Sequence, residues 1–144
     1  MILYLDTSSL LKLYVEEAGT SDVQARVEAA DVVATSVIAY PEAHAAFAGR
    51  HREGALTRSE FQRALERFRD AWSHLLALLV SVPIARRAGT LAINHRLRGM
   101  DALHLASYVE LLGSENAVEF LSHDSRLMAA AAKERRQHRR RGSR

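Results

Sequence analysis

The chain has 144 residues, which is the length of one domain. Hydrophobic residues make up 48% of it and charged residues 26%, a composition that is typical of globular proteins and excludes a wholly disordered one. The absence of cysteine excludes disulfide frameworks, thiolate zinc sites and cysteine nucleophiles. Residues 133–144 hold seven basic residues and one acidic residue, a net charge of +6, so residues 1–132 carry −3 of the total of +3. No apolar run approaches about 20 residues and the first six residues carry no basic group, so we expect a cytoplasmic protein without a membrane span or signal peptide.

The first half of the chain alternates signals for strands and helices. Short apolar runs predict buried strands, and apolar residues at helical spacing predict helices. In chain order we expect a strand over residues 2–5, a helix through Leu10 and Tyr14, a helix over residues 22–30, a strand over residues 32–35 and a helix through Glu42 and Phe47. Asp6 is expected to be the N-cap of the first helix, and Pro41 either lies in the first turn of the third helix or kinks it.

The second half continues this alternation. Thr57 and Glu60 form a capping-box pattern at the start of a helix that carries an apolar stripe. After it we expect a strand within the apolar run 75–82, a helix from Pro83 through Ile93, a helix over residues 100–112, a strand over residues 117–121 and a helix over residues 127–134. Strands separated by helices, without hairpin signals, predict an α/β fold in which a central parallel sheet of four or five strands has helices on both faces. This domain covers residues 1–132, and residues 133–144 form a basic C-terminal tail.

Four acidic residues are expected at one edge of this sheet. Asp6 directly follows the first strand, Glu42 lies about two turns beyond the second, Asp101 begins a helix, and Asp124 follows the last strand. Ligands of parallel α/β sheets bind at the carboxyl ends of the strands. With only Arg126 nearby, such a cluster persists if some carboxylates protonate or if divalent cations bind, and all-oxygen ligands favour Mg²⁺ or Mn²⁺. These ions clamp phosphate oxygens and activate water in nucleases and phosphatases.

Each acid also has an explanation that involves no ligand. Asp6 and Asp124 can cap helices, and Asp101 can interact with the dipole of its helix. Glu42 can be a solvated helix residue. The four acids together, in chain order and at strand ends, favour a site.

Four segments resemble the motifs of the PIN-domain ribonucleases, and specifically of the VapC-type toxins of bacterial toxin–antitoxin pairs. The segments are residues 3–10 (LYLDTSSL), Thr35-Ser36 followed by Glu42, residues 100–106 (MDALHLA) and residues 120–127 (FLSHDSRL). All four occur in the order of the family, and the likeness covers nearly all of residues 1–132.

The resemblance implies a PIN-like α/β/α fold and a metal-dependent endoribonuclease that hydrolyses RNA and is neutralised by a cognate VapB-type antitoxin. Carried over by position, the four acids would be catalytic and would bind Mg²⁺ or Mn²⁺. Ser8 and Ser122 would be supporting hydroxyls that orient a carboxylate or a bound water, the alternative being capping or turn chemistry.

Three features qualify the resemblance. The family usually adds a short last strand after the closing helix, whereas a charged segment follows residue 132 here. His123 beside Asp124 is either a general base or a loop histidine without a catalytic role. His104, one helical turn after Asp101, is expected to be a packed helix residue rather than a ligand.

Two other classes of enzyme also use acidic residues at strand ends. A haloacid-dehalogenase-type phosphatase needs a second aspartate where Ser8 stands, and a receiver-like phosphotransfer domain needs a lysine after a late strand, whereas the only lysines are Lys12 and Lys133. Both classes fit poorly. The non-enzyme alternative is a catalytically inactive PIN-like module that binds RNA or a partner.

Two surfaces are expected to bind partners. The stripe formed by Phe61, Leu65, Phe68 and Trp72 predicts a homodimer interface, the alternative being that the monomer core covers it. The basic tail is expected to be flexible and to hold RNA by its positive charge, the alternatives being a solvated segment or one that serves only the antitoxin. Its expected RNA-binding residues are Arg135, Arg136, Arg139, Arg140 and Arg141.

Overall fold

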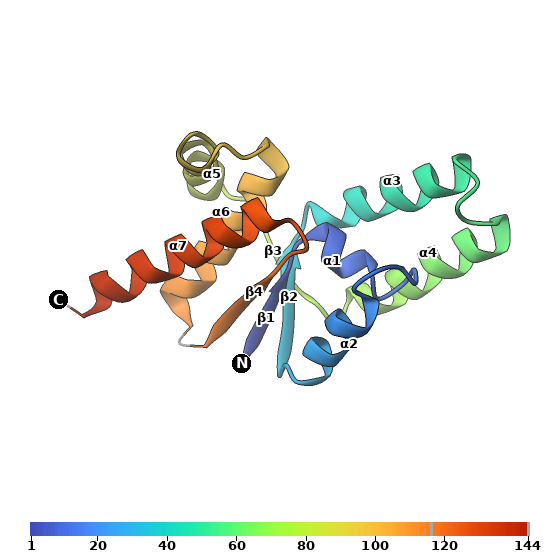
Figure 1. The fold of residues 1–144 in the computed structure, drawn as a ribbon, viewed down its shortest axis with the longest axis horizontal. Coiled ribbons are helices and arrows are strands. Elements are labelled where there is room, and N and C mark those ends of the chain that lie inside the picture. Colours follow the sequence, from blue (N-terminus) through green and yellow to red (C-terminus); the bar gives the residue numbers. More distant parts are fainter. Residues whose placement is uncertain (116, 144) are drawn as a thin grey trace.

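A four-stranded parallel sheet lies at the centre of the protein (Figure 1). The computed structural model describes residues 1–115 and 117–143. The strands are β1 (Ile2–Leu5), β2 (Val32–Ser36), β3 (Leu76–Leu78) and β4 (Val118–Leu121), in the order β3-β2-β1-β4, and each neighbouring pair is parallel. The parallel sheet confirms the predicted fold class, with the lower of the two expected strand numbers.

The described residues form seven helices, each close to a predicted one. They are α1 (Thr7–Leu11), α2 (Thr20–Glu28), α3 (Ala39–Arg52), α4 (Arg58–Trp72), α5 (Val82–His95), α6 (Gly99–Ser114) and α7 (Ser125–Gly142). Asp6 caps helix α1 directly at the end of β1, as predicted, and the helix ends at Leu11, before the predicted Tyr14. Pro41 lies in the first turn of α3, where its missing N–H leaves no helical hydrogen bond unmade.

The two faces of the sheet pack against separate groups of helices. Leu3 and Leu5 of β1 belong to one apolar cluster, built with helices α1 to α4, whereas Tyr4 between them belongs to the other, built with α5 to α7. All three side chains are fully buried. Alternate residues of a strand point to opposite faces, so burial on both faces produces the three-layer α/β/α arrangement seen in Figure 1.

The register of β1 against β4 fixes the edge where the acids lie. Leu5, the last residue of β1, is paired with Leu121, the last residue of β4. The residues that follow, Asp6 and Ser122, therefore leave the sheet side by side. The carboxyl end of β2, at Ser36, lies at the same edge.

The apolar stripe of α4 packs inward. The predicted capping box starts the helix, with Thr57 accepting a hydrogen bond from the Glu60 amide at 3.1 Å. Phe68 is fully buried, and Phe61, Leu65 and Trp72 are partly buried against the same cluster. The monomer core therefore covers most of this stripe, which was the alternative to a homodimer interface, and the homodimer itself stays a prediction.

Strand β3 is shorter than the apolar run that contains it. Only residues 76–78 pair with β2, and the chain then turns outward, leaving Leu79 75% and Val82 64% exposed. Ile93 on α5 is 80% exposed. Large apolar side chains therefore lie on the surface beside the edge strand.

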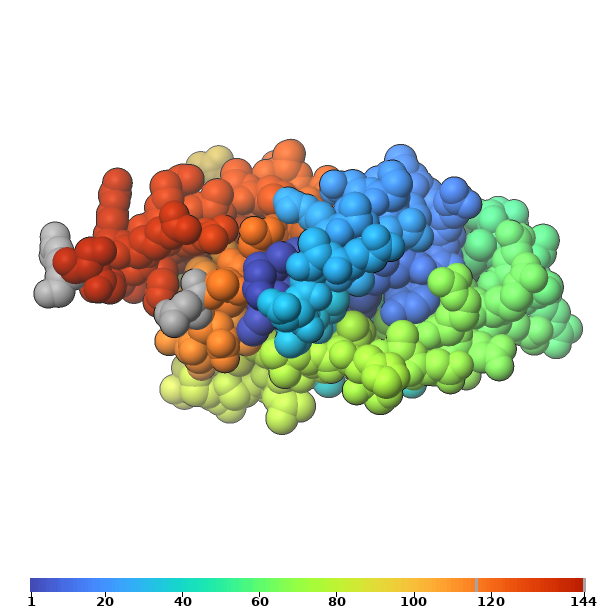
Figure 2. Space-filling view, turned by 90° about the horizontal axis from the view of Figure 1, so that it is seen from below, coloured from blue at the N-terminus to red at the C-terminus, as the bar shows by residue number. Residues whose placement is uncertain are grey.

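Helix α7 continues through the basic segment, which corrects the prediction of a flexible tail. Residues 125–142 form one helix, and no additional strand follows residue 132 within the described part of the chain. Alanine, arginine, lysine, glutamine and glutamate favour helix, and no proline interrupts them. Figures 1 and 2 show α7 forming one end of the elongated molecule and the α3–α4 pair the other. No helix among the described residues is long and apolar enough to span a membrane.

Candidate active site

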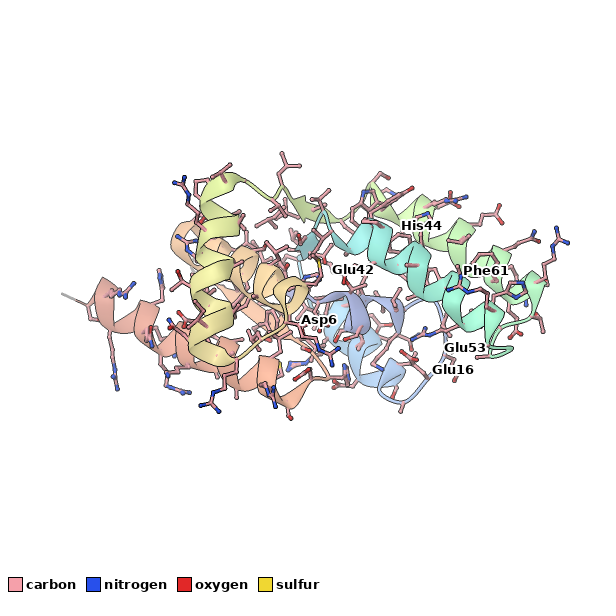
Figure 3. All side chains as sticks on the ribbon, turned by 90° about the horizontal axis from the view of Figure 1, so that it is seen from above. Asp6, Glu16, Glu42, His44, Glu53 and Phe61 are labelled. Carbon is pink, nitrogen blue, oxygen red and sulfur yellow. The ribbon has the colours of Figure 1, made fainter. Side chains whose placement is uncertain are left out.

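The four predicted acids follow strand ends or begin helices around one edge of the sheet. Asp6 is the N-cap of α1, Glu42 and Asp101 lie in the first turns of α3 and α6, and Asp124 is the N-cap of α7. Figure 3 looks down on this edge, where Asp6 and Glu42 lie near the middle of the molecule.

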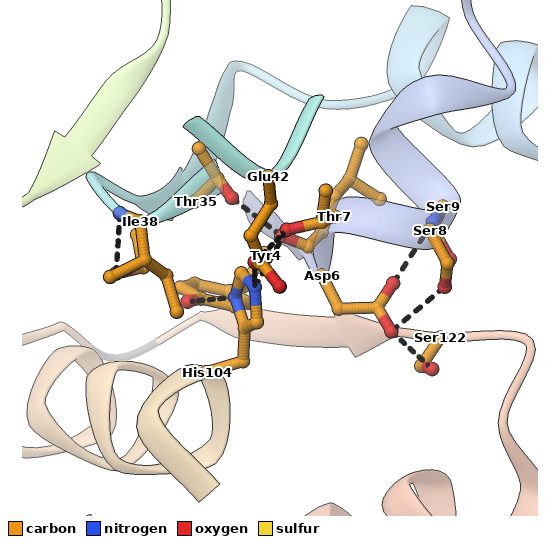
Figure 4. Close-up of polar contacts among 12 residues, drawn as sticks. Tyr4, Asp6, Thr7, Ser8, Ser9, Thr35, Ile38, Glu42, His104 and Ser122 are labelled. Carbon is orange, nitrogen blue, oxygen red and sulfur yellow. Dashed lines mark hydrogen bonds and ion pairs between the residues drawn. The ribbon is translucent and has the colours of Figure 1, made fainter. Parts of the chain in front are cut away.

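Asp6 is the most tightly held of the four. Its side chain is buried, and its Oδ1 accepts a hydrogen bond from the Ser9 amide at 3.0 Å. Its Oδ2 accepts hydrogen bonds from the hydroxyls of Ser122 at 2.6 Å and Ser8 at 3.1 Å (Figure 4). Both predicted supporting serines therefore meet on one oxygen of the first acid.

Asp124 is exposed and held by its helix. Its Oδ1 accepts hydrogen bonds from the amides of Arg126 and Leu127 at 2.9 and 3.0 Å, and its own amide donates to the Ser122 hydroxyl at 3.0 Å. Asp124 can therefore cap α7 and also belong to an acidic site, because capping uses only its Oδ1 oxygen. Ser122 connects the last acid to the first.

The acids influence one another electrostatically. Burial raises the pKa of Asp101 above its ordinary value, and the negative charges of Asp124, Asp6 and Glu42 raise it further, against a smaller opposing effect of His104. Within residues 1–115 and 117–143, neither Asp6, Asp101 nor Asp124 forms a salt bridge. Mutually repelling oxygen ligands without a basic partner fit a divalent cation.

The side chains are not yet gathered tightly around one point. No group of three or more histidine, aspartate or glutamate side chains in the described part of the chain is arranged as a set of metal ligands. The four acids nevertheless offer carboxylate oxygens, the ligand type that hard divalent cations prefer.

Two residues of the site were missed or underestimated from the sequence. Thr7 donates a 2.5 Å hydrogen bond to Oε1 of Glu42, and His104 Nε2 lies 3.1 Å from the same oxygen. Burial raises the pKa of Glu42, but these two hydrogen bonds outweigh it and hold the pKa below its ordinary value. His104 is packed, as predicted, but it also contacts an acid of the site. Its place one turn after Asp101 was the available signal.

His123 has contacts of its own. Its Nδ1 lies 3.1 Å from the Ser9 hydroxyl, and its ring lies against Gly19, where a Cβ would come within 2.6 Å of Nε2. Gly19 has a φ of 89°, which favours glycine. These contacts position the loop before α7 against the start of α2.

The five predicted RNA-binding arginines are exposed or partly exposed residues of α7, away from the acids along the helix. At 1.5 Å per residue, they lie about 16 to 26 Å from Asp124 along the axis. Arg141 also lines a groove of about 520 Å³ between α5, α6 and α7, together with Arg87, Glu110 and Glu134.

The chain is similar to known proteins over most of its length. The family model of the PIN domain matches residues 3–134. Two proteins named Ribonuclease VapC45 and Ribonuclease VapC49, from Mycobacterium tuberculosis strains CDC 1551 / Oshkosh and ATCC 25618 / H37Rv, are each 38% identical over 106 residues. The matched region is 74% of this chain and 74% of each relative.

Proposed function

Because the chain belongs to the PIN-domain family, and within it to the VapC group, we propose that it is an endoribonuclease toxin that hydrolyses RNA phosphodiester bonds with Mg²⁺ or Mn²⁺. The observation that carries the proposal is the Asp6 carboxylate, which is buried at the end of β1. Its negative charge and that of Asp124 raise the pKa of Asp101, and none of these three acids forms a salt bridge in the described chain. Since the substrate is cellular RNA, we place its action in the cytoplasm.

The four acids would hold the metal ion. A bound divalent cation supplies charge stabilisation for the phosphate and lowers the pKa of a coordinated water. Ser8 and Ser122 fix the orientation of the Asp6 carboxylate, and the caps of α1 and α7 fix Asp6 and Asp124 to rigid elements. These contacts preorganise the oxygens, so that little reorganisation opposes the reaction.

The basic face of α7 is proposed to hold the RNA backbone. Its arginines lie too far from the acids to take part in the chemistry, but an RNA strand of several nucleotides spans that distance. Binding through phosphate charges is independent of sequence and sensitive to salt. This segment would therefore govern affinity rather than the chemical step.

Two protein partners belong to the proposal. A VapB-type antitoxin would neutralise the enzyme. A homodimer is supported by the exposed apolar residues beside β3, since Val82 and Ile93 lie on one face of α5 with the small residues Ala85 and Gly89 between them.

The deciding experiment is RNA cleavage with and without metal. Wild-type protein should cleave in Mn²⁺ and not in EDTA, whereas Asp6→Asn and Asp101→Asn should lose activity in Mn²⁺ while remaining folded. Asp70→Asn, at an exposed position on α4, is the matched control and should cleave like the wild type. RNA binding without cleavage by the wild type under all metal conditions would favour the inactive binding module.

A further inference from the structure

His104 lies in the interior behind the acids, with both ring nitrogens in polar contact. The residue is 1% exposed. Its Nδ1 lies 2.9 Å from the Tyr4 hydroxyl, and its Nε2 lies 2.9 Å from the Thr7 hydroxyl and 3.1 Å from Oε1 of Glu42. Figure 4 shows His104 between Tyr4 and Glu42.

The direction of these hydrogen bonds follows from the groups involved. The Glu42 carboxylate can only accept, so the Thr7 hydroxyl donates to it, and the single N–H at Nε2 of His104 is shared between Oε1 of Glu42 and the oxygen of Thr7. Burial raises the pKa of Tyr4, which remains a phenol and donates to Nδ1. The chain of donors therefore runs from Tyr4 through His104 to Glu42, with the ring proton on Nε2.

A histidine at this position needs an explanation beyond packing. The surrounding part of α6 is apolar, including Leu105 and Ala106, and a buried polar ring is costly unless its nitrogens are bonded. Leucine would fill the space without that cost. The hydrogen bonds that offset the cost of burying His104 all belong to one network, which ends at Glu42, an acid of the site.

We propose that His104 is a positioning residue that holds the Glu42 carboxylate in the orientation in which it binds the metal ion, with Tyr4 setting the tautomer of the ring. The inference rests on the proposed function, because it takes Glu42 as a ligand. The hydrogen bonds occupy Oε1, and no hydrogen bond to Oε2 occurs within the described residues. Since His104 follows Asp101 by one turn of α6, the same contact fixes Glu42 relative to Asp101.

A double-mutant cycle on Mn²⁺ affinity tests this role without RNA. His104→Leu should weaken Mn²⁺ binding, measured by titration calorimetry, by about 10-fold or more, as loss of hydrogen bonds to metal ligands commonly does. In a Glu42→Gln background the same substitution should change the affinity by less than about twofold, because the group on which His104 acts is gone. Equal losses in both backgrounds would show a merely structural role and overturn the proposal.

Two further variants keep the test decisive. His104→Gln restores an N–H donor toward Glu42 and should recover most of the affinity lost in the leucine variant, whereas an equal loss in both would contradict the inference. If thermal unfolding in EDTA shows that His104→Leu does not fold, Tyr4→Phe replaces it in the cycle, because Tyr4→Phe removes the hydrogen bond to Nδ1 that sets the tautomer of His104.

Asp6→Asn separates this inference from the proposed function. If Asp6→Asn binds Mn²⁺ as well as the wild type does, the proposed metal site itself is wrong. If Asp6→Asn loses binding but the His104 and Glu42 substitutions act independently, the site stands and only the positioning role of His104 is overturned.

Discussion

The hydroxyl of Ser122 donates a 2.6 Å hydrogen bond to Oδ2 of Asp6, although 116 residues separate the two in the chain. The contact exists because Leu5 and Leu121, which precede them, are paired in the sheet. Ser122 also accepts a hydrogen bond from the Asp124 amide. One buried serine thus holds the first acid and the loop that carries the last.

Ser122→Ala should therefore impair the site more than Ser8→Ala. The Ser122 hydroxyl is buried and has two partners, whereas Ser8 is exposed and its single bond is 3.1 Å long. We expect Ser122→Ala to reduce kcat by about 10-fold or more, and to lower the free energy of unfolding by about 1–3 kcal/mol, as an unsatisfied buried group commonly does. Ser8→Ala should have a clearly smaller effect on both. Single-turnover cleavage and urea unfolding measure the two quantities, and equal effects of the two substitutions would contradict the prediction.

Asp101→Asn should leave the metal-free protein as stable as the wild type or more stable at neutral pH. Burial and the neighbouring acids raise the pKa of Asp101 in the folded state above its ordinary value of 3.8, so above that pH the folded protein binds more protons than the unfolded chain. The stability contributed by this group therefore falls as the pH rises from that value through the raised pKa. Asparagine removes this penalty.

Thermal unfolding in EDTA between pH 4 and pH 7 measures the difference between the two proteins, which should widen in favour of Asp101→Asn as the pH rises. Mn²⁺ should then stabilise the wild type more than the variant, because a ligand is lost. A variant that is less stable than the wild type in EDTA at every pH would contradict the repulsion on which the proposed site rests.

The sequence predicts best where its signals are local. Asp6 was expected to cap α1 and Thr57 to cap α4, and both caps are present, because a cap depends on residues within a single turn. The parallel sheet followed from short apolar runs separated by helices. Predicting that the acids lie at one edge of the sheet required only the rule that the carboxyl ends of parallel strands lie at the same edge.

The errors concern what local signals cannot determine. The contact between His104 and Tyr4 spans 100 residues, so no spacing in the sequence reveals it. The charges after residue 132 suggested a solvated tail, but the same residues favour helix and extend α7. The stripe of α4 has more large apolar side chains than one helix usually buries. The sequence does not show that Tyr14, Phe47 and other residues of the core pack against it.

Ile93→Asp should dissociate the proposed homodimer without unfolding the monomer. Ile93 is 80% exposed, so a charge there meets water in the monomer but would be buried in an interface. Trp72→Ala is the matched contrast, because Trp72 packs against the core of the monomer and its loss should lower stability rather than change the oligomeric state. Light scattering should give twice 16.0 kDa for the wild type and 16.0 kDa for Ile93→Asp. A wild-type particle of 16.0 kDa at micromolar concentration would contradict the dimer.

The basic face of α7 should control the affinity for RNA and its dependence on salt. Lys133, Arg136 and Arg140 are exposed and lie on one face of the helix. Replacing all three with glutamine keeps residues that favour helix, and it avoids truncation, which would remove Glu134, the partly buried partner of His95. If each charge neutralises one phosphate of a single strand, the log–log salt slope of binding should flatten by about 2.

A matched variant at the other end of the molecule controls for net charge. The α3–α4 pair forms that end (Figure 2). Arg52, Arg58 and Arg63 are exposed on this pair, and their replacement with glutamine removes the same number of charges. This control should leave the salt slope nearly unchanged, and neither variant should alter cleavage at saturating RNA, because none of the six residues contacts the acids. Binding measured by fluorescence anisotropy without antitoxin, over a range of salt concentrations, distinguishes the two variants. Equal slopes in the two would mean that the RNA responds to total charge and not to α7, and a reduced rate at saturating RNA in the α7 variant would mean that this helix takes part in more than binding.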